Sequence, residues 1–235
     1  MKTKKIRKIM DELEVGYDQM SDKFSNTRSF FWKDLAFIAD YIENGSSVLD
    51  FGCGNGRLLE ILKDKKIDYT GIDISQKLID LAKTKYPENS ESFLKVTSQD
   101  SLAFSDNFFN NIIAIAVFHH FPKDYANKMA EEFYRIAKPG GIVIITVWNL
   151  WQRKYWKNIF NFSMLKRFFQ SGRFSGFGFR DIFVPFQNNG NEVFNRYHRV
   201  YTKKELADIF VEAGFEIERC SLVNNRNIII IARKK

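Results

Sequence analysis

The chain has 235 residues, of which 45% are hydrophobic, and its 36 basic and 28 acidic residues give a formal net charge of +8. This length suits one domain with a sizeable core, and two cysteines are too few for a disulfide framework, which indicates a cytoplasmic protein. The apolar runs are too short to cross a bilayer, no signal peptide is apparent at the charged N-terminus, and the positive charge suits a polyanionic partner.

The first part of the chain is predicted to be helical, and the rest alternates strands with helices. Residues 5–42 favour helix, with a break near 21–27 and an amphipathic segment over 29–43 that ends at Asn44-Gly45. The alternation that follows predicts a doubly wound, mostly parallel α/β sheet of seven strands. We expect strands at 46–51, 68–73, 92–97, 111–117, 141–148, 215–222 and 227–233, and helices at 56–65, 75–86, 123–137 and 202–213.

Residues 48–56 (VLDFGCGNG) predict a buried strand that ends in a tight glycine turn and opens a helix. Glycines let the backbone approach a ligand closely. We expect this turn to contact a cofactor through Gly52, Cys53 and Gly54. Asp50 lies at the carboxyl end of the strand, where open α/β sheets bind ligands. The dinucleotide fingerprint needs glycine where this chain has Arg57, and a ligand with an ammonium group tolerates Asp50 better than a pyrophosphate does. Both facts favour S-adenosylmethionine (SAM) over NAD.

Two further acids follow apolar runs along the chain. Asp73 ends the strand 69–74, about 20 residues beyond the glycine turn, where an acid accepts the ribose hydroxyls of a nucleoside. Asp100 follows the third strand, where its carboxylate can accept the exocyclic amino group of an adenine. We expect the cofactor site to include three more residues near these strand ends: Ile74, Ser101 and Ala116.

Residues 149–201 interrupt the alternation between the fifth strand and the last helix. The segment interleaves many aromatic residues with basic ones. Aromatic side chains stack on bases and cations hold phosphates, as in proteins that bind single-stranded RNA. Alternatively, the segment is a small helical cap whose aromatic residues form its own core. On the first interpretation, the substrate contacts include Arg167, Arg173 and Arg180.

The glycine turn, Asp73, Asp100 and the run 135–141 (RIAKPGG) together resemble the class I SAM-dependent methyltransferases over roughly residues 35–148. The resemblance implies SAM as cofactor and the Rossmann-like doubly wound sheet of that class. It further implies one methyltransferase domain over 1–235, made of four parts. These are a helical lid (1–44), a SAM-binding core (45–148), a substrate-facing insertion (149–201), and a final helix and hairpin (202–235).

The chain also resembles a narrower family, the tRNA wobble-uridine carboxymethyl methyltransferases, which form the methyl ester of 5-carboxymethyluridine. The similar segments are Phe24–Arg28 with Trp32, 115–121, Val147-Trp148, 181–186, Arg196-Tyr197, Val200-Tyr201 and Glu205-Leu206. The chain departs from the family at Lys33, where proline is usual, and at 196–199, which read Arg-Tyr-His-Arg instead of Arg-Tyr-Tyr-His.

The implied chemistry is an in-line methyl transfer, for which the enzyme mainly supplies proximity and orientation. A carboxylate acceptor needs no general base but does need a cationic cradle, for which Arg28 and Arg196 are the candidates, with Tyr197 assisting. His119 and His120 follow the fourth strand, and one of them could be the base if the acceptor were a hydroxyl or an amine. Trp148 is expected to line the substrate pocket.

Three functions stay open at this point. The first is a tRNA-directed methyltransferase. The second is a small-molecule O- or N-methyltransferase with a closing cap. The third is a non-catalytic RNA-binding protein, against which the three strand-end acids argue. Eukaryotic members of the resembled family work with a small zinc-binding activator subunit. The chain has no zinc-binding spacing of its own, because two distant cysteines cannot form such a site, so we expect no metal.

Overall fold

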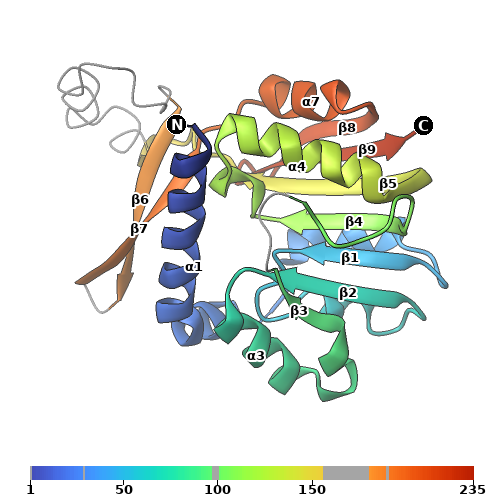
Figure 1. Ribbon diagram of the computed structural model, residues 1–235, viewed down its shortest axis with the longest axis horizontal. Coiled ribbons are helices and arrows are strands. Elements are labelled where there is room, and N and C mark those ends of the chain that lie inside the picture. Colours follow the sequence, from blue (N-terminus) through green and yellow to red (C-terminus); the bar gives the residue numbers. More distant parts are fainter. Residues whose placement is uncertain (1, 29, 97–100, 156–179, 189–190) are drawn as a thin grey trace.

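The computed structural model describes residues 2–28, 30–96, 101–155, 180–188 and 191–235. Its main sheet has seven strands in the order β3-β2-β1-β4-β5-β9-β8, which confirms the predicted α/β class (Figure 1). The parallel strands are β1 (Ser47–Phe51), β2 (Asp68–Asp73), β3 (Phe93–Lys95), β4 (Phe109–Ile115) and β5 (Ala137–Trp148). The closing hairpin of β8 (Phe215–Val223) and β9 (Asn227–Lys234) pairs antiparallel to β5.

Each face of the sheet has its own hydrophobic core. Ile112 and Ala114 of β4 belong to one core, and Ile113 and Ile115 belong to the other, because successive side chains of a strand point to opposite faces. The first core is covered by α4 (Lys123–Ile136) and α7 (Lys203–Glu212). The second is covered by the 3₁₀ segment η1 (Lys33–Tyr41), α2 (Leu59–Leu62) and α3 (Gln76–Lys85). Three further 3₁₀ segments are η2 (Pro87–Ser92), η3 (Phe118–His120) and η4 (Arg153–Tyr155).

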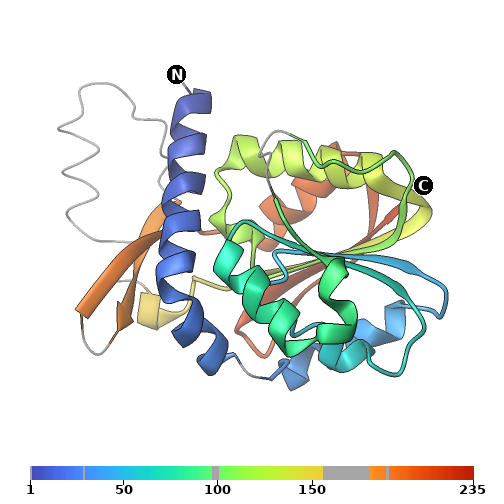
Figure 2. The ribbon, with the colours of Figure 1, turned by 60° about the horizontal axis from the view of Figure 1, so that its bottom comes forward.

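The N-terminal helix differs from the prediction. The expected break near 21–27 is wrong, because α1 is one helix over Lys2–Thr27. The amphipathic segment that follows contains the 3₁₀ helix η1 at Lys33–Tyr41 instead of an α-helix. Ile9, Met10 and Leu13 of α1 belong to the first core, and tertiary packing of this kind stabilises a helix beyond its local sequence preference. Figures 1 and 2 show α1 standing across the carboxyl ends of the parallel strands.

The described part of the insertion contains η4 and a β-hairpin. β6 (Asp181–Asn188) and β7 (Asn191–Arg199) pair antiparallel in a separate two-stranded sheet, which lies beside α1 (Figure 2). Ile182 and Val184 of β6 form a small core with Leu150 and Val200. Three residues of the predicted site lie outside the described residues: Asp100, Arg167 and Arg173.

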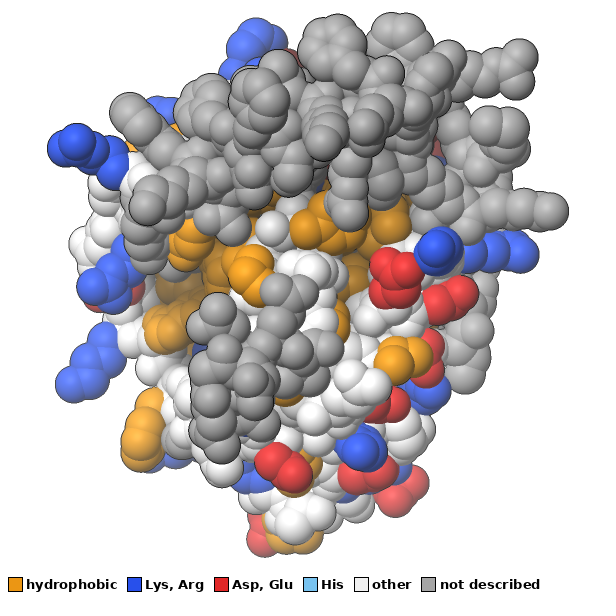
Figure 3. All heavy atoms as spheres, turned by 90° about the vertical axis from the view of Figure 1, so that its left-hand side faces the viewer, with side chains coloured by type: hydrophobic (Ala, Val, Ile, Leu, Met, Phe, Trp, Pro, Cys, Tyr) orange, Lys and Arg blue, Asp and Glu red, His pale blue; other side chains and the backbone are white. Residues whose placement is uncertain are grey.

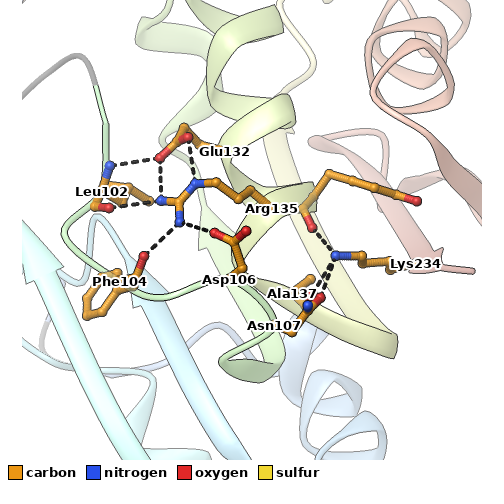
Figure 4. A network of polar contacts seen from close by, with 9 residues as sticks. Leu102, Phe104, Asp106, Asn107, Glu132, Arg135, Ala137 and Lys234 are labelled. Carbon is orange, nitrogen blue, oxygen red and sulfur yellow. Dashed lines mark hydrogen bonds and ion pairs between the residues drawn. The ribbon is translucent and has the colours of Figure 1, made fainter.

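An arginine at the end of α4 fastens the loop that leads into β4 (Figure 4). The Arg135 guanidinium donates to the carbonyl oxygens of Leu102 and Phe104, 3.0 and 2.7 Å away, and to Asp106 at 2.8 Å. Glu132 accepts from the same guanidinium and from the Leu102 amide. The run 135–141 therefore begins with a residue that holds the loop before β4 in place.

Among the described helices, none has both the length and the apolar character of a membrane span.

The glycine turn after β1 leaves no room for an added side chain at Gly56. Gly56 has φ +74°, and a Cβ there would lie 2.8 Å from the ring of buried Phe93, whereas Gly140 has φ +77° and open space around it. Gly140→Ala should lose about 1–2 kcal/mol of unfolding free energy from backbone strain alone. Gly56→Ala should have the same strain cost and lose a further ~1–3 kcal/mol of unfolding free energy, because its Cβ overpacks against Phe93. Urea unfolding checks this, and equal losses in both variants would contradict it.

Candidate cofactor and acceptor site

A pocket lies at the carboxyl ends of β1, β2 and β4, between α1 and β7. Figure 3 views this side of the molecule, where hydrophobic side chains gather in the middle of the face and charged ones nearer its edges. The predicted residues that line the pocket are Arg28, Asp50, Gly52, Cys53, Gly54, Asp73, Ala116, His119, His120, Trp148 and Arg196. The fold therefore brings together cofactor and acceptor candidates that lie far apart in the sequence.

The glycine turn is bonded to the end of β2. The Gly54 amide donates to Asp73 Oδ2 at 2.9 Å, and the Ser75 amide donates to Asp73 Oδ1 at 2.9 Å. Gly52 has φ +72°, and a Cβ there would lie 2.3 Å from Val117 Cγ2, so only glycine fits at this position. Burial raises the pKa of Asp73, and the backbone donors oppose that rise.

Asp50 is buried beneath the pocket. Its carboxylate accepts a hydrogen bond from the Tyr69 hydroxyl at 2.8 Å. Burial raises the pKa of Asp50 to about 7, a rise that the Tyr69 hydrogen bond and the nearby Arg57 oppose. An ammonium group on a ligand stabilises the ionised carboxylate, so Asp50 suits the amino group of SAM.

Ala116 holds an unusual backbone conformation at the end of β4. Its φ is +59°, which is rare for a residue with a side chain. The Ala116 amide donates to both the carbonyl and the hydroxyl oxygen of Thr146, each at 3.0 Å. Such strain is typical of functional sites. Two other predicted cofactor residues, Ile74 and Ser101, are not among the residues that line the pocket.

Three arginines enter the pocket, and no carboxylate among the described residues forms a salt bridge with any of them. Arg28 stacks on Phe24 with 4.3 Å from Cζ to the ring centroid, and Arg57 stacks on Trp32 at 4.0 Å. Burial, together with Arg28, lowers the pKa of Arg57 to about 10, and burial lowers the pKa of Arg28 as well.

The third arginine, Arg196, lies between two aromatic rings. Its Cζ is 4.7 Å from the Phe186 ring centroid and 5.3 Å from that of Trp148. The side chain is buried, and its Nε lacks a hydrogen-bond partner among the described residues. Aromatic faces hold the guanidinium in place without neutralising its charge. An anion is therefore the natural ligand between Arg28 and Arg196.

Two predicted substrate residues do not lie in the pocket. Successive residues of β7 point to opposite sides, so Tyr197 faces away from Arg196. Its hydroxyl donates to Asp181 at 2.6 Å. Burial and Asp181 raise the pKa of Tyr197 far above its usual range. Arg180 forms an ion pair with Glu205, at the start of α7. Neither residue is placed to hold an acceptor.

Three histidines meet beside the pocket, although only two were expected there. The possible ligand atoms of His119, His120 and His198 lie within 4.8 Å of one another, and all three rings are buried. His198 was missed because the predicted site stopped at Tyr197. Strand alternation offered a signal, since His198 is two residues beyond Arg196 and so shares its face of β7.

His120 is engaged at both ring nitrogens. The Tyr17 hydroxyl of α1 donates to Nε2 at 2.8 Å, and Nδ1 lies 2.9 Å from the Tyr197 carbonyl oxygen of β7. Burial lowers the pKa of His120 to about 3, so the ring is neutral. His120 therefore joins α1 to the hairpin and has no free nitrogen for proton transfer. Sequence reasoning also missed Tyr17, which lines the pocket.

The pKa of Asp50 predicts a pH-dependent cofactor affinity. As the pH falls through about 7, Asp50 takes up a proton and loses its attraction for an ammonium group, so SAM binding should weaken. Asp50→Asn should bind SAM roughly tenfold to a hundredfold more weakly at pH 8, without that pH dependence. Titration calorimetry at pH 6 and pH 8 measures both.

The stability of the Asp50→Asn variant provides the control. Because folding raises the pKa of Asp50, its ionisation costs stability as the pH rises through about 7. The unliganded variant should therefore be no less stable than the parent at pH 8. Equal SAM affinities of parent and variant at pH 8 would contradict the assignment.

Comparisons with known proteins agree with this geometry. A family model described as a methyltransferase domain matches residues 24–219. The tRNA (carboxymethyluridine(34)-5-O)-methyltransferase of Arabidopsis thaliana is 37% identical over 133 residues, which are 56% of this chain and 31% of that protein. The chain thus matches less than a third of that relative's length.

Two solved structures share the fold. A SAM-dependent methyltransferase from Methanosarcina mazei is 23% identical, with a TM-score of 0.67 over 87% of this chain and 98% of that one. A chain from the Haloferax volcanii complex between the Trm112 methyltransferase activator and a methyltransferase is 17% identical, with a TM-score of 0.66 over 96% of this chain and 96% of that one. Because the family model matches residues 24–219, which are most of the chain, the chain belongs to the methyltransferase-domain family and is a SAM-dependent methyltransferase.

Proposed function

We propose that this methyltransferase methylates the carboxylate of a carboxymethylated wobble uridine in tRNA. The observation that carries the proposal is the pair Arg28 and Arg196, two cations without a described carboxylate partner in the same pocket as Asp50 and the glycine turn. The similarity to the carboxymethyluridine methyltransferase of Arabidopsis thaliana supports it.

The pocket suits an in-line displacement on the cofactor's methyl group. SAM held at Asp50 and the glycine turn would supply an electrophilic methyl group, and its transfer to a carboxylate oxygen held by Arg28 and Arg196 would give a methyl ester and S-adenosylhomocysteine. Arginines hold the carboxylate without protonating it, since they keep their charge at all physiological pH values. Proximity and orientation of this kind are worth up to about 7–11 kcal/mol of the barrier.

Contacts with the rest of the tRNA belong to the insertion and to a partner. Arg167, Arg173 and Arg180 remain proposed phosphate contacts, and Arg180 also forms an ion pair with Glu205. We also propose a small activator subunit as a partner, which the fold similarity to the Trm112-bound enzyme supports.

A second candidate function is a small-molecule methyltransferase whose lid closes over its acceptor. The hydrogen bond between Tyr17 and His120 favours it, because it fastens α1 over the pocket. The unpaired arginines restrict such acceptors to anions. Methylation of small carboxylates without any transfer to RNA would establish this alternative.

The deciding experiment is transfer of labelled methyl from SAM to bulk tRNA, followed by nucleoside analysis with and without mild base. Label that is lost in base is a methyl ester and supports the proposal, whereas base-stable label in RNA means a different acceptor atom. Absence of label, despite measured SAM binding and an added activator subunit, would overturn it. Binding of tRNA should also weaken steeply with salt.

Replacing Arg196 tests the acceptor cradle. Arg196→Lys keeps the charge but loses the planar fork, so kcat/KM for the acceptor should fall roughly tenfold to a hundredfold, while SAM affinity changes little. The matched control is Arg219→Lys, because Arg219 also stacks on an aromatic ring, that of Phe37, but does not line the pocket. Equal activity of both variants would contradict the role of Arg196.

A further inference from the structure

The hydrogen-bond partners of two buried histidines fix their tautomers. His198 Nδ1 lies 3.0 Å from the Arg196 carbonyl oxygen, which only accepts, so Nδ1 carries the hydrogen and Nε2 is bare. His119 Nδ1 lies 3.4 Å from the Trp148 amide nitrogen, which only donates, so the hydrogen of His119 is on Nε2.

His119 is held rigidly at the wall of the pocket. Its ring stacks on Trp148, with centroids 5.1 Å apart, and on His198, with centroids 4.8 Å apart and planes 11° from parallel. Burial lowers the pKa of His119 well below its usual range, so the ring is neutral. Its Nε2 lacks a partner among the described residues, although the residue lines the pocket. An unpartnered buried N–H group of this kind has a strong preference for an acceptor atom.

A divalent cation is the other ligand that three imidazoles suggest. Arg28 and Arg196 lie nearby and oppose a cation, and no carboxylate belongs to the cluster among the described residues. The nearly parallel rings of His119 and His198 do not converge on one point, and Tyr17 already occupies His120 Nε2. A metal on His119 Nε2 would also exclude the hydrogen there, so the two interpretations are mutually exclusive.

We propose that His119 Nε2–H donates to the exocyclic carbonyl oxygen O4 of the acceptor base, and so selects uracil over cytosine. This inference rests on the proposed function. In 5-carboxymethyluracil, C4 with its oxygen is bonded to C5, which carries the carboxymethyl arm. An arm held by Arg28 and Arg196 therefore brings O4 into the pocket that His119 lines. Cytosine has an amino group at that position, so a donor would face a donor, at a cost of about tenfold to a hundredfold in kcat/KM.

The test compares RNA hairpins that carry 5-carboxymethyluridine or 5-carboxymethylcytidine at the same position. His119→Gln keeps an N–H donor near the position of Nε2, and His119→Phe keeps the aromatic stack without the donor. The wild type and His119→Gln should prefer the uridine hairpin, while His119→Phe should lose the preference by slowing on uridine. Calorimetry should show unchanged SAM affinity in both variants, which separates this role from a folding defect.

The outcomes distinguish this inference from the proposed function. If the wild type methylates the uridine hairpin and His119→Phe keeps the full preference, the inference is overturned and the function stands. Stoichiometric zinc in the purified wild type, lost in His119→Phe, would also overturn the inference, because the metal would occupy Nε2. A wild type that binds SAM but methylates neither hairpin would overturn both.

Discussion

The cofactor half of the site depends on the buried hydrogen bond from the Gly54 amide to Asp73. This bond joins the turn after β1 to the end of β2, and the same carboxylate accepts from the Ser75 amide where α3 begins. The Ser75 hydroxyl in turn donates to Asp18 of α1 at 2.6 Å. Asp73 thus joins the glycine turn to the start of α3, and Ser75 joins that start to α1. Burial of that acid is tolerable because backbone donors replace the lost water.

The acceptor side of the pocket is held together differently, because the neutral ring of His120 connects α1 to β7. His120 receives a hydrogen bond from α1 and makes another to β7, and β7 carries Arg196. The hairpin has its own small core and its own sheet, so its position against the main sheet depends on such contacts. The cofactor half of the pocket is built into the sheet, and the acceptor half is attached to it.

The sequence predicted the parts of the structure that depend on local patterns. The expected strand at 68–73 matches β2, and the expected helix at 75–86 matches α3, because apolar runs and helix caps such as Ser75 act over a few positions. The predicted helix at 56–65 is only a short α2 at Leu59–Leu62. The meeting of Tyr17 with His120, 103 residues away, depends on tertiary packing that no local pattern contains. Likewise, no local pattern indicates that Arg180 forms an ion pair with Glu205 at the start of α7.

The unpaired arginines have a consequence for the stability of the fold. In the free protein, the half-buried Arg28 and the buried Arg196 are like charges that repel each other, and no carboxylate among the described residues compensates them with a salt bridge. Any anion that occupies the pocket relieves this repulsion in the folded state only. The free enzyme should therefore melt at a higher temperature in phosphate or acetate than in chloride at the same ionic strength. A binding site that holds two like charges close together thus lowers the stability of the free protein.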